Sequence, residues 1–411
     1  MKMNRSFINL IILSFLILIS SCAKNNQKSQ SIEDESLYTI SAENNSSKTT
    51  KYDSFINNLK FLKLETNTDC LIGEEIKNVK IEKDRIFILD NNTNLFVFDL
   101  NGNFLHKIGR RGDGPGEVQS ISNFCLNKEL EEIILFDIAK NTLLLFDYDG
   151  KFIRSTKFNE RLDITNFEVI NNKELLVEFL NTKYNDVPDS NRRYNYGIVN
   201  IEDNSIKSRF IPFLVKLNMP VLMNGLMETS DKQALMTTLF SNTLYKYDRK
   251  SDKMQKYLEI TPKDDLKFIS SSTFEQDQSQ DYSEVMQYIY KNNYTHGINK
   301  ILLTSKYIFL NVWTEQGKTT HIVFDMETHQ SFEFNFDKKL IAELDEYILN
   351  IPPFKNNNTV IKVLQSEYLI ANKTKYEPIK GLYDSINELN GEENPILIFY
   401  DLNHLLESSE S

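Results

Sequence analysis

Apolar residues along most of this chain come in short runs, separated by Asn, Asp, Gly and Lys. Short apolar or alternating runs between turn-forming residues are typical of β-strands. A helical repeat protein would instead show 3.6-residue periodicity in every unit, and this chain does not. The pattern from Leu59 onward therefore predicts an all-β protein.

The runs recur as an internal repeat. Leu95–Phe104 (LFVFDLNGNF) is matched by Leu143–Phe152 (LLLFDYDGKF). In both copies a β-rich run enters a turn whose Asp side chain accepts backbone hydrogen bonds, while Gly permits positive φ. Weaker copies end at the turn residues Asn200, Asp248, Asp325 and Asp401. The chain therefore contains six copies of one unit.

Each unit has further strand candidates upstream of its turn. The nearer ones are Arg85–Leu89, Glu132–Phe136, Glu174–Phe179, Gln233–Leu239, Tyr307–Val312 and Tyr368–Ala371. Candidates for inner strands are Ile76–Ile81, Ile121–Leu126, Phe167–Ile170 and Thr359–Val363. Three to four strands in about fifty residues make one blade of a β-propeller. We predict a six-bladed β-propeller over residues 53–411.

The two ends of this region are complementary. Only Leu402–Ser411 follow the sixth turn, so no fourth strand fits there, whereas Lys60–Leu64 precedes the first blade without a hairpin partner. Pairing of Lys60–Leu64 with Ile396–Tyr400 would complete the last blade and remove two open sheet edges. The sequence therefore predicts a ring closed by an N-terminal strand.

Two longer units carry helical periodicity. Apolar residues at Tyr282, Val285, Met286 and Ile289 predict a helical insertion at about 276–293. Leu340, Ile341, Leu344, Tyr347 and Ile348 predict another at about 338–350, ended by Pro352-Pro353. We expect these insertions to cover one face of the ring over a channel mouth. The alternative is that they only fill a hydrophobic gap.

The first residues predict export. Lys2 and Arg5 precede the apolar run Phe7–Ile19, and Ile19-Ser-Ser-Cys22 follows as a lipobox. The run is shorter than the ~20 apolar residues that span a bilayer. We interpret residues 1–21 as a lipoprotein signal peptide and Cys22 as the lipidation site, which places the protein in the cell envelope. Residues 22–52 are polar and are expected to be a flexible tether.

Charge limits the classes of partner. The net charge is −11, and removal of Lys2 and Arg5 with the signal peptide makes it −13. An acidic chain does not favour nucleic acid or a basic membrane-binding face, so the lipid on Cys22 is the expected membrane contact. Cys70 and Cys125 could pair or could be buried thiols. A chain of this length does not need the disulfide to bury a core.

Three segments resemble a known family. Ile86–Asp90 (IFILD), Phe98–Gly102 (FDLNG) and Ile108–Glu117 (IGRRGDGPGE) resemble the six-bladed β-propeller lipoproteins of Gram-negative bacteria with NHL-like repeats. The resemblance covers roughly residues 55–402, and the glycine-rich element is its most specific part. It implies the propeller fold and no particular reaction, because that family is defined by its fold.

The glycine-rich segment Gly109–Gly116 offers one candidate site. It lacks the Gly-Lys-Ser/Thr ending of a P-loop, so we interpret it as the tight connection between two blades. Arg110 and Arg111 would then lie near one face of the ring and could contact an anionic ligand.

Catalytic signatures are lacking in the sequence. The five histidines show no metal-ligand spacing, and there is no Gly-x-Ser-x-Gly motif. We therefore expect no cofactor and a binding or scaffold module, with a protein or small-molecule partner at one propeller face, rather than an enzyme. The rival hypothesis is a hydrolase or lyase of the NHL-like propeller type with a divalent metal in the central channel.

Overall fold

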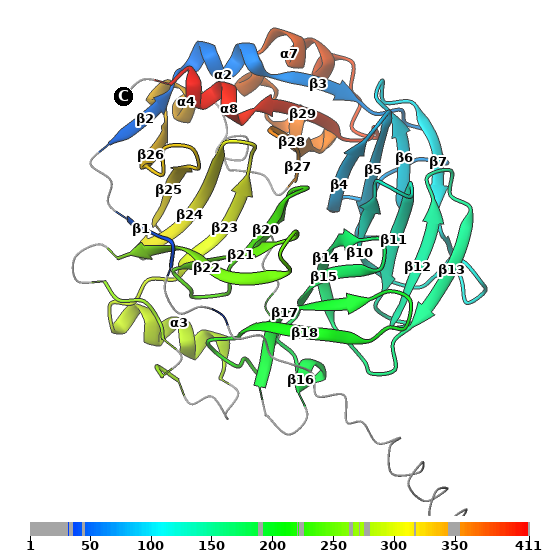
Figure 1. Cartoon of the computed structure of the whole chain (residues 1–411). Helices are drawn as coiled ribbons and strands as arrows, with labels where there is room; N and C mark the ends of the chain where they lie inside the picture. Colours follow the sequence, from blue (N-terminus) through cyan, green and yellow to red (C-terminus); the bar gives the residue numbers. More distant parts are fainter. Residues whose placement is uncertain are drawn as a thin grey trace, which may run out of the picture.

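Six β-sheets stand around a common centre in the computed structural model (Figure 1). The described residues are 32, 36–42, 46–187, 192–219, 221, 226–262, 266–270, 272–274, 280–315, 318–343 and 354–409. The predicted all-β, six-bladed propeller is confirmed. Within each blade neighbouring strands of the meander are antiparallel, and the first strand of the meander faces the centre of the ring.

The first three blades follow one another directly. Blade 1 consists of β4 (Ile76–Glu82), β5 (Arg85–Asp90), β6 (Leu95–Asp99) and β7 (Phe104–Ile108). Blade 2 consists of β10 (Ile121–Asn127), β11 (Glu132–Asp137), β12 (Thr142–Asp147) and β13 (Phe152–Lys157). Blade 3 consists of β14 (Ile164–Asn171), β15 (Glu174–Phe179), β17 (Arg192–Asn200) and β18 (Ile206–Pro212), with β16 (Asp186–Val187) beside β17 and the 3-10 turn η1 (Lys183–Asn185) before it.

The other three blades recruit the N-terminal segment. Blade 4 consists of β19 (Met227–Thr229), β20 (Gln233–Met236), β21 (Thr243–Asp248) and β22 (Lys253–Thr261). Blade 5 consists of β23 (Gly297–Leu303), β24 (Tyr307–Glu315), β25 (Lys318–Asp325) and β26 (Ser331–Phe336). Blade 6 consists of β27 (Phe354–Asn356), β28 (Thr359–Leu364), β29 (Ile396–Asp401) and β3 (Lys60–Lys63).

Strand β3 closes the ring as predicted. It pairs antiparallel with β29, with Leu62 opposite Leu397 and Phe61 opposite Ile398. The first blade also holds this strand, because the backbone N–H of Glu65 donates to Gly102 O at 2.7 Å. Gly102 has φ +85°, and a Cβ there would lie 2.3 Å from Lys63 O, so only glycine fits this turn.

Part of the predicted tether is ordered, which corrects the sequence-based assignment of residues 22–52. Strand β1 (Tyr38–Ser41) adds to β22, and β2 (Ser47–Thr50) adds to β26, both as parallel outermost strands. The polar sequence concealed them because an edge strand gains backbone hydrogen bonds whatever its side chains are. Cys22 and the signal peptide lie outside the described residues.

The core lies between the blades. Central strands such as β5 and β6 are buried on both faces, because each blade packs between two others, whereas β13 alternates between half-buried and exposed positions. Cys70 and Cys125 belong to this core as separate buried free thiols, so they do not form a disulfide with each other.

The repeated turn residues act as predicted. Asp99 Oδ1 accepts the backbone N–H groups of Asn101 at 2.8 Å and Asn103 at 2.9 Å, and Asp147 holds the equivalent turn of blade 2. Asp401 instead caps the helix α8 (Leu402–Glu407), where its side chain accepts the N–H of His404. The sixth repeat therefore ends in a helix that packs beside α2 (Tyr52–Asn58).

The expected strand at Tyr368–Ala371 is wrong, because that segment is part of a helix. Blade 6 contains a helical excursion between β28 and β29, formed by α6 (Ser366–Ala371), η2 (Lys373–Tyr376) and α7 (Lys380–Asn387). Its apolar residues Leu369, Leu382 and Ile386 are buried in the core beside blade 6. A short apolar run does not by itself distinguish strand from helix.

The two predicted insertions do contain helices, but not over the channel. Helix α3 (Tyr282–Lys291) lies on the outer side of the ring in Figure 1, and Val285 and Ile289 pack with Phe240. The described part of the second insertion is α4 (Lys338–Glu343), where Leu340 is buried, and residues 344–350 lie outside the described residues. Both described helices fill gaps at the rim, so the expectation that the insertions cover a channel mouth is wrong for residues 282–291 and 338–343.

Candidate functional site: a polar cavity at the centre of the ring

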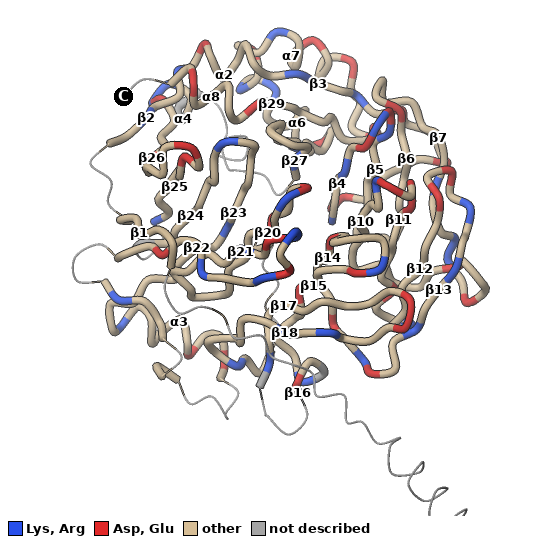
Figure 2. The backbone as a smooth tube through the Cα atoms, viewed as in Figure 1, with Lys and Arg blue, Asp and Glu red and all other residues tan. Residues whose placement is uncertain are grey.

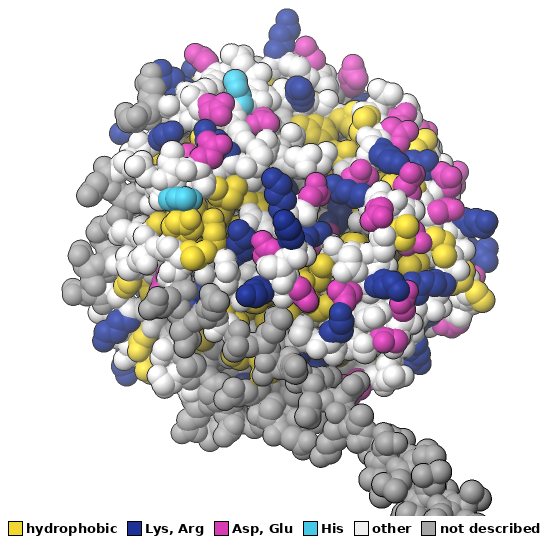
Figure 3. All heavy atoms as spheres, viewed as in Figure 1, with side chains coloured by type: hydrophobic (Ala, Val, Ile, Leu, Met, Phe, Trp, Pro, Cys, Tyr) yellow, Lys and Arg dark blue, Asp and Glu magenta, His cyan; other side chains and the backbone are white. Residues whose placement is uncertain are grey.

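A cavity of about 900 Å³ occupies the centre of the ring. Its wall includes residues of the innermost strands β4, β10, β14, β19 and β27, and residues of the hairpins that follow the inner strands of blades 2 to 6. Charged side chains gather around the centre of the face seen in Figure 3, and Figure 2 shows that charged residues occur along the inner strands and hairpins of the blades. The site is therefore assembled from segments far apart in sequence.

Charged residues of both signs line the cavity. Among the described residues the cations are Lys77, Lys80, Lys128, Lys232, Lys246, Arg249 and Lys355. The acidic residues are Glu129, Glu168, Glu178, Glu228, Asp231 and Asp248. Such a wall suits a polar ligand and not an apolar one.

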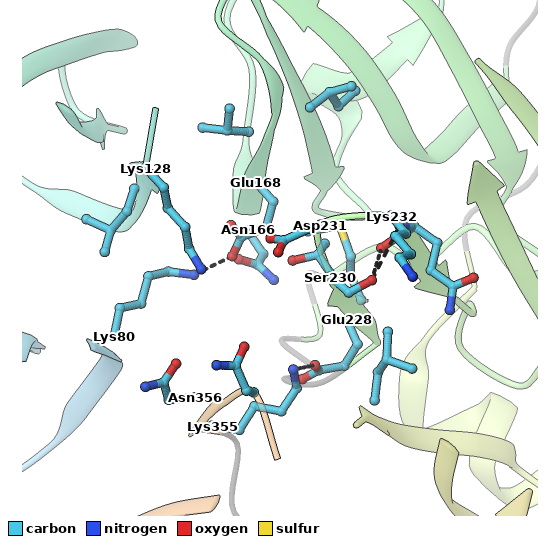
Figure 4. Close-up of a pocket in the computed structure, with 18 of the residues that line it drawn as sticks. Lys80, Lys128, Asn166, Glu168, Glu228, Ser230, Asp231, Lys232, Lys355 and Asn356 are labelled. Atoms are coloured by element: carbon cyan, nitrogen blue, oxygen red, sulfur yellow. Dashed lines mark hydrogen bonds and ion pairs between the residues drawn. The ribbon is translucent and has the colours of Figure 1, made fainter. Parts of the chain in front are cut away.

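Two ion pairs cross the cavity (Figure 4). Lys80 of blade 1 contacts Glu168 of blade 3, and Lys355 of blade 6 lies 2.9 Å from Glu228 of blade 4. Burial opposes the charge on Lys80, but attraction by Glu168 and the hydrogen bond that Lys80 donates to Glu168 prevail, so the pKa of Lys80 is raised. Burial raises the pKa of Glu228, and Lys355 opposes this shift. Each pair joins two blades that are not neighbours in the ring.

Three asparagines form a chain of side-chain hydrogen bonds along the wall. Asn78 Nδ2 donates to Asn123 Oδ1 at 2.7 Å, and Asn123 Nδ2 donates to Asn166 Oδ1 at 3.0 Å. All three follow a β-bulge at the start of an inner strand, after Ile76, Ile121 and Ile164. Because a bulge redirects the side chain that follows it, equivalent amides of three blades meet at the cavity wall.

Glu178 lies at the end of this chain. It is opposite Asn166 in the pairing of β14 with β15, and only 8% of it is exposed. Burial raises the pKa of Glu178 to about 8, and a hydrogen bond with Asn166 opposes the shift only in part. A carboxyl group with this pKa is largely protonated and uncharged at pH 7.

A family model described as "Domain of unknown function (DUF4934)" matches residues 37–401, which include all six blades and the cavity. The chain belongs to the DUF4934 family. No curated protein matches the sequence significantly.

Solved structures share the fold of this DUF4934 chain. A Bacteroides fragilis protein described as exported has a TM-score of 0.64 at 18% identity, covering 88% of this chain and 98% of that one. A Bacteroides vulgatus member of the duf4221 family has a TM-score of 0.48 at 10% identity, covering 84% and 98%. At 18% identity the likeness to the Bacteroides fragilis protein shows the propeller fold alone.

The sequence-predicted arginines of the DUF4934 chain lie away from the cavity. Arg110 and Arg111 form β8, which pairs with β9 (Glu117–Val118) in the connection from blade 1 to blade 2. Both are exposed, and Arg110 Nη2 donates to Glu117 Oε1 at 3.0 Å. Gly109–Gly116 thus makes the expected connection between blades, and the proposed role of the two arginines in binding stays a prediction.

The described part of this DUF4934 chain contains no cluster of metal-ligating side chains. No group of three or more His, Cys, Asp or Glu residues there could hold a metal ion. The cavity carboxylates Glu168 and Glu228 face lysines instead. The rival hypothesis of a metal-dependent hydrolase or lyase stays a prediction.

Sequence reasoning missed the cavity residues, although a signal was present. Ile76-Lys-Asn78, Ile121-Ser-Asn123 and Ile164-Thr-Asn166 repeat Ile-x-Asn at the start of three inner strands. Alignment of the repeats on this triplet would have placed three amides at one height of the ring. The ion pairs have no comparable signal, because the partners come from different blades.

Proposed function

We propose that this protein is a cell-envelope lipoprotein that binds a small polar ligand in the central cavity of its propeller. The main support for this proposal is the cavity itself, whose volume of about 900 Å³ lies within the usual range for small-molecule sites. Its wall offers hydrogen-bond donors, acceptors and charges from segments that only the closed ring brings together. A binding module fits this arrangement of polar and charged groups.

Ligand-observed NMR on the protein without its signal peptide tests this function. Pools of polar metabolites should contain compounds that bind the wild type, and Asn356→Trp should abolish the binding. Asn356 ends β27 on the cavity wall, so an indole there would occupy ligand space (Figure 4). The melting temperature of this variant should stay close to that of the wild type, because Asn356 is not in the buried core.

Binding that persists in Asn356→Trp would place the ligand elsewhere and reject the central site. Lys60→Trp on the exposed outer strand β3 is the matched control, and it should bind as the wild type does.

Anchoring through Cys22 is the second part of the proposal. Support comes from the lipobox at Ile19–Cys22 and from the apolar run before it. Within the described residues no helix is long and apolar enough to cross a membrane. Cys22→Ser should abolish incorporation of a palmitate analogue and leave unprocessed precursor, whereas Cys70→Ser should label normally. A labelled Cys22→Ser protein would show that the lipobox interpretation is wrong.

A further inference from the structure

Arg249 is a cavity residue whose hydrogen-bonding capacity is not satisfied. It follows Asp248 at the end of β21, and its backbone N–H donates to Lys232 O at 3.3 Å. Its side-chain Nε is buried and has no hydrogen-bond partner among the described residues. A buried donor without a partner is unfavourable, so a ligand acceptor that reaches the Arg249 guanidinium would offset that cost.

The cavity cations exceed the carboxylates available to them. Among the described residues Lys80, Lys128 and Lys355 form ion pairs, whereas Lys77, Lys232, Lys246 and Arg249 have no carboxylate oxygen within 4.0 Å. Lys77 instead donates to the carbonyl oxygen of Ile121 at 3.0 Å, and Lys246 lies over the Tyr257 ring.

The acidic residues of the wall compensate these cations only in part. Asp248 accepts the backbone N–H groups of Lys250 and Ser251, and Glu178 is largely uncharged at pH 7 because burial raises its pKa to about 8. In the described part of the wall Asp231 and Glu129 form no ion pair, although Glu168 and, more weakly, Asp231 attract Arg249 at longer range. The cavity is thus cationic on balance, although the whole chain has a net charge of −11. A local field of this sign concentrates anions.

The neutral part of the wall is rich in amides. Nine asparagines line the cavity: Asn78, Asn123, Asn127, Asn166, Asn171, Asn172, Asn356, Asn357 and Asn358. A side-chain amide both donates and accepts, which matches hydroxyl groups. Phe354 is the one aromatic residue among the described lining residues, so the wall offers little surface for stacking a flat ring.

We propose that the ligand is a hydroxyl-rich oxyanion, such as an acidic or phosphorylated sugar, an inference that rests on the proposed function. Arg249 binds the anionic group of this ligand. Lys232 lies beside Arg249 on the neighbouring hairpin and adds to the same charge. The asparagines bind the hydroxyls, and the crossing ion pairs hold the wall in place.

Titration calorimetry at constant ionic strength, with the protein lacking its signal peptide, tests the proposal. The probes are D-glucuronate, D-glucose 6-phosphate and D-glucose, which differ only in the group at C6. At least one acid should bind at least about tenfold more tightly than glucose, because a hydrogen bond to a charged group is stronger than one between neutral groups. Binding of glucuronate alone would assign a carboxylate, and binding of the phosphate alone would assign a phosphoryl group.

Substitutions test which residues bind the anionic group of the ligand. Arg249→Gln should weaken acid binding at least about tenfold, and Lys232→Gln, at an exposed position that does not endanger folding, should weaken it a few-fold, about 1 kcal/mol or less. Arg161→Gln is the matched control and should leave the affinity unchanged, since Arg161 is exposed and does not line the cavity.

Three results would overturn the inference: no binding of either acid, binding of glucose as tight as that of the acids, or unchanged acid affinity in Arg249→Gln. If neither acid binds but a neutral metabolite binds the wild type and not Asn356→Trp, the inference of an anionic ligand is wrong and the central binding site is retained. If neither the acids nor any such metabolite binds, both the anionic ligand and the central binding site are rejected.

Discussion

A chain that begins at residue 67 should lose several kcal/mol of unfolding free energy, because the ring can no longer close. The truncation removes β3, which pairs with β29, and it exposes the partners of Phe55 and Leu64, which are 0% and 1% exposed. Each large apolar side chain removed from a core costs about 1.5–3 kcal/mol, and unpaired buried backbone groups of β29 add about 1–3 kcal/mol each. Urea unfolding measures the loss.

Smaller changes show how much individual parts of the N-terminal segment contribute to stability. Phe55→Ala should cost about 3–5 kcal/mol, whereas Lys60→Ala at an exposed position of β3 should stay within about 0.5 kcal/mol. A chain that begins at residue 51 loses β1 and β2, so burial of Ile40 alone predicts a loss of about 1.5–3 kcal/mol.

The closing contact itself can be trapped chemically. Cysteines at Leu62 and Leu397, which are paired in the register of β3 and β29, should crosslink under oxidising conditions and raise the unfolding midpoint. An unchanged melting temperature in the chain that begins at residue 67 would refute closure by β3.

Glu178→Gln should remove a pH dependence of stability. Burial raises the pKa of Glu178 from 4.5 to about 8, so the folded state keeps a proton that the unfolded state releases. Below about pH 4.5 both states are protonated and the penalty is absent. As the pH rises from 4.5 to about 8, the unfolded state is progressively favoured, by up to about 1.4 kcal/mol per pH unit.

The wild type should therefore lose several kcal/mol from this group between pH 5 and pH 8.5. Glu178→Gln stays neutral and retains an amide beside Asn166, so it should be more stable than the wild type at pH 8.5 and nearly equal to it at pH 5. Urea unfolding at both pH values provides the measurement. Glu129→Gln, exposed on the same cavity wall, should follow the wild type. Parallel pH profiles of Glu178→Gln and the wild type would show that Glu178 is not the group responsible.

Local chemistry made the blades predictable from sequence. The Asp-containing turn of Leu95–Phe104 recurs in Leu143–Phe152 because an aspartate stabilises its turn through its own backbone neighbours, whatever the distant structure is. Closure by Lys60–Leu64 was also predictable, because an unpaired strand at one end of a repeat array and a missing strand at the other must satisfy each other's backbone groups.

Segments whose conformation depends on distant partners were not predictable. The polar sequence of β2, Ser47–Thr50, carries no hydrophobic signal, and this strand forms because the edge of blade 5 accepts its hydrogen bonds. The apolar run at Tyr368–Ala371 fits a strand or a helix, and packing of Leu369 in the core beside blade 6 decides for the helix.

The residues that line the cavity could be identified only from the tertiary structure. Lys80 and Glu168 are 88 positions apart in sequence, and no local pattern reveals that two blades bring them into contact. Arg249 follows the same kind of turn aspartate as the other repeats, and only the ring shows that its side chain lines the cavity. Turn chemistry and backbone pairing act over a few residues, so the repeating unit and its closing strand could be read from the chain. The site depends on how six such units converge, and that is a property of the closed ring.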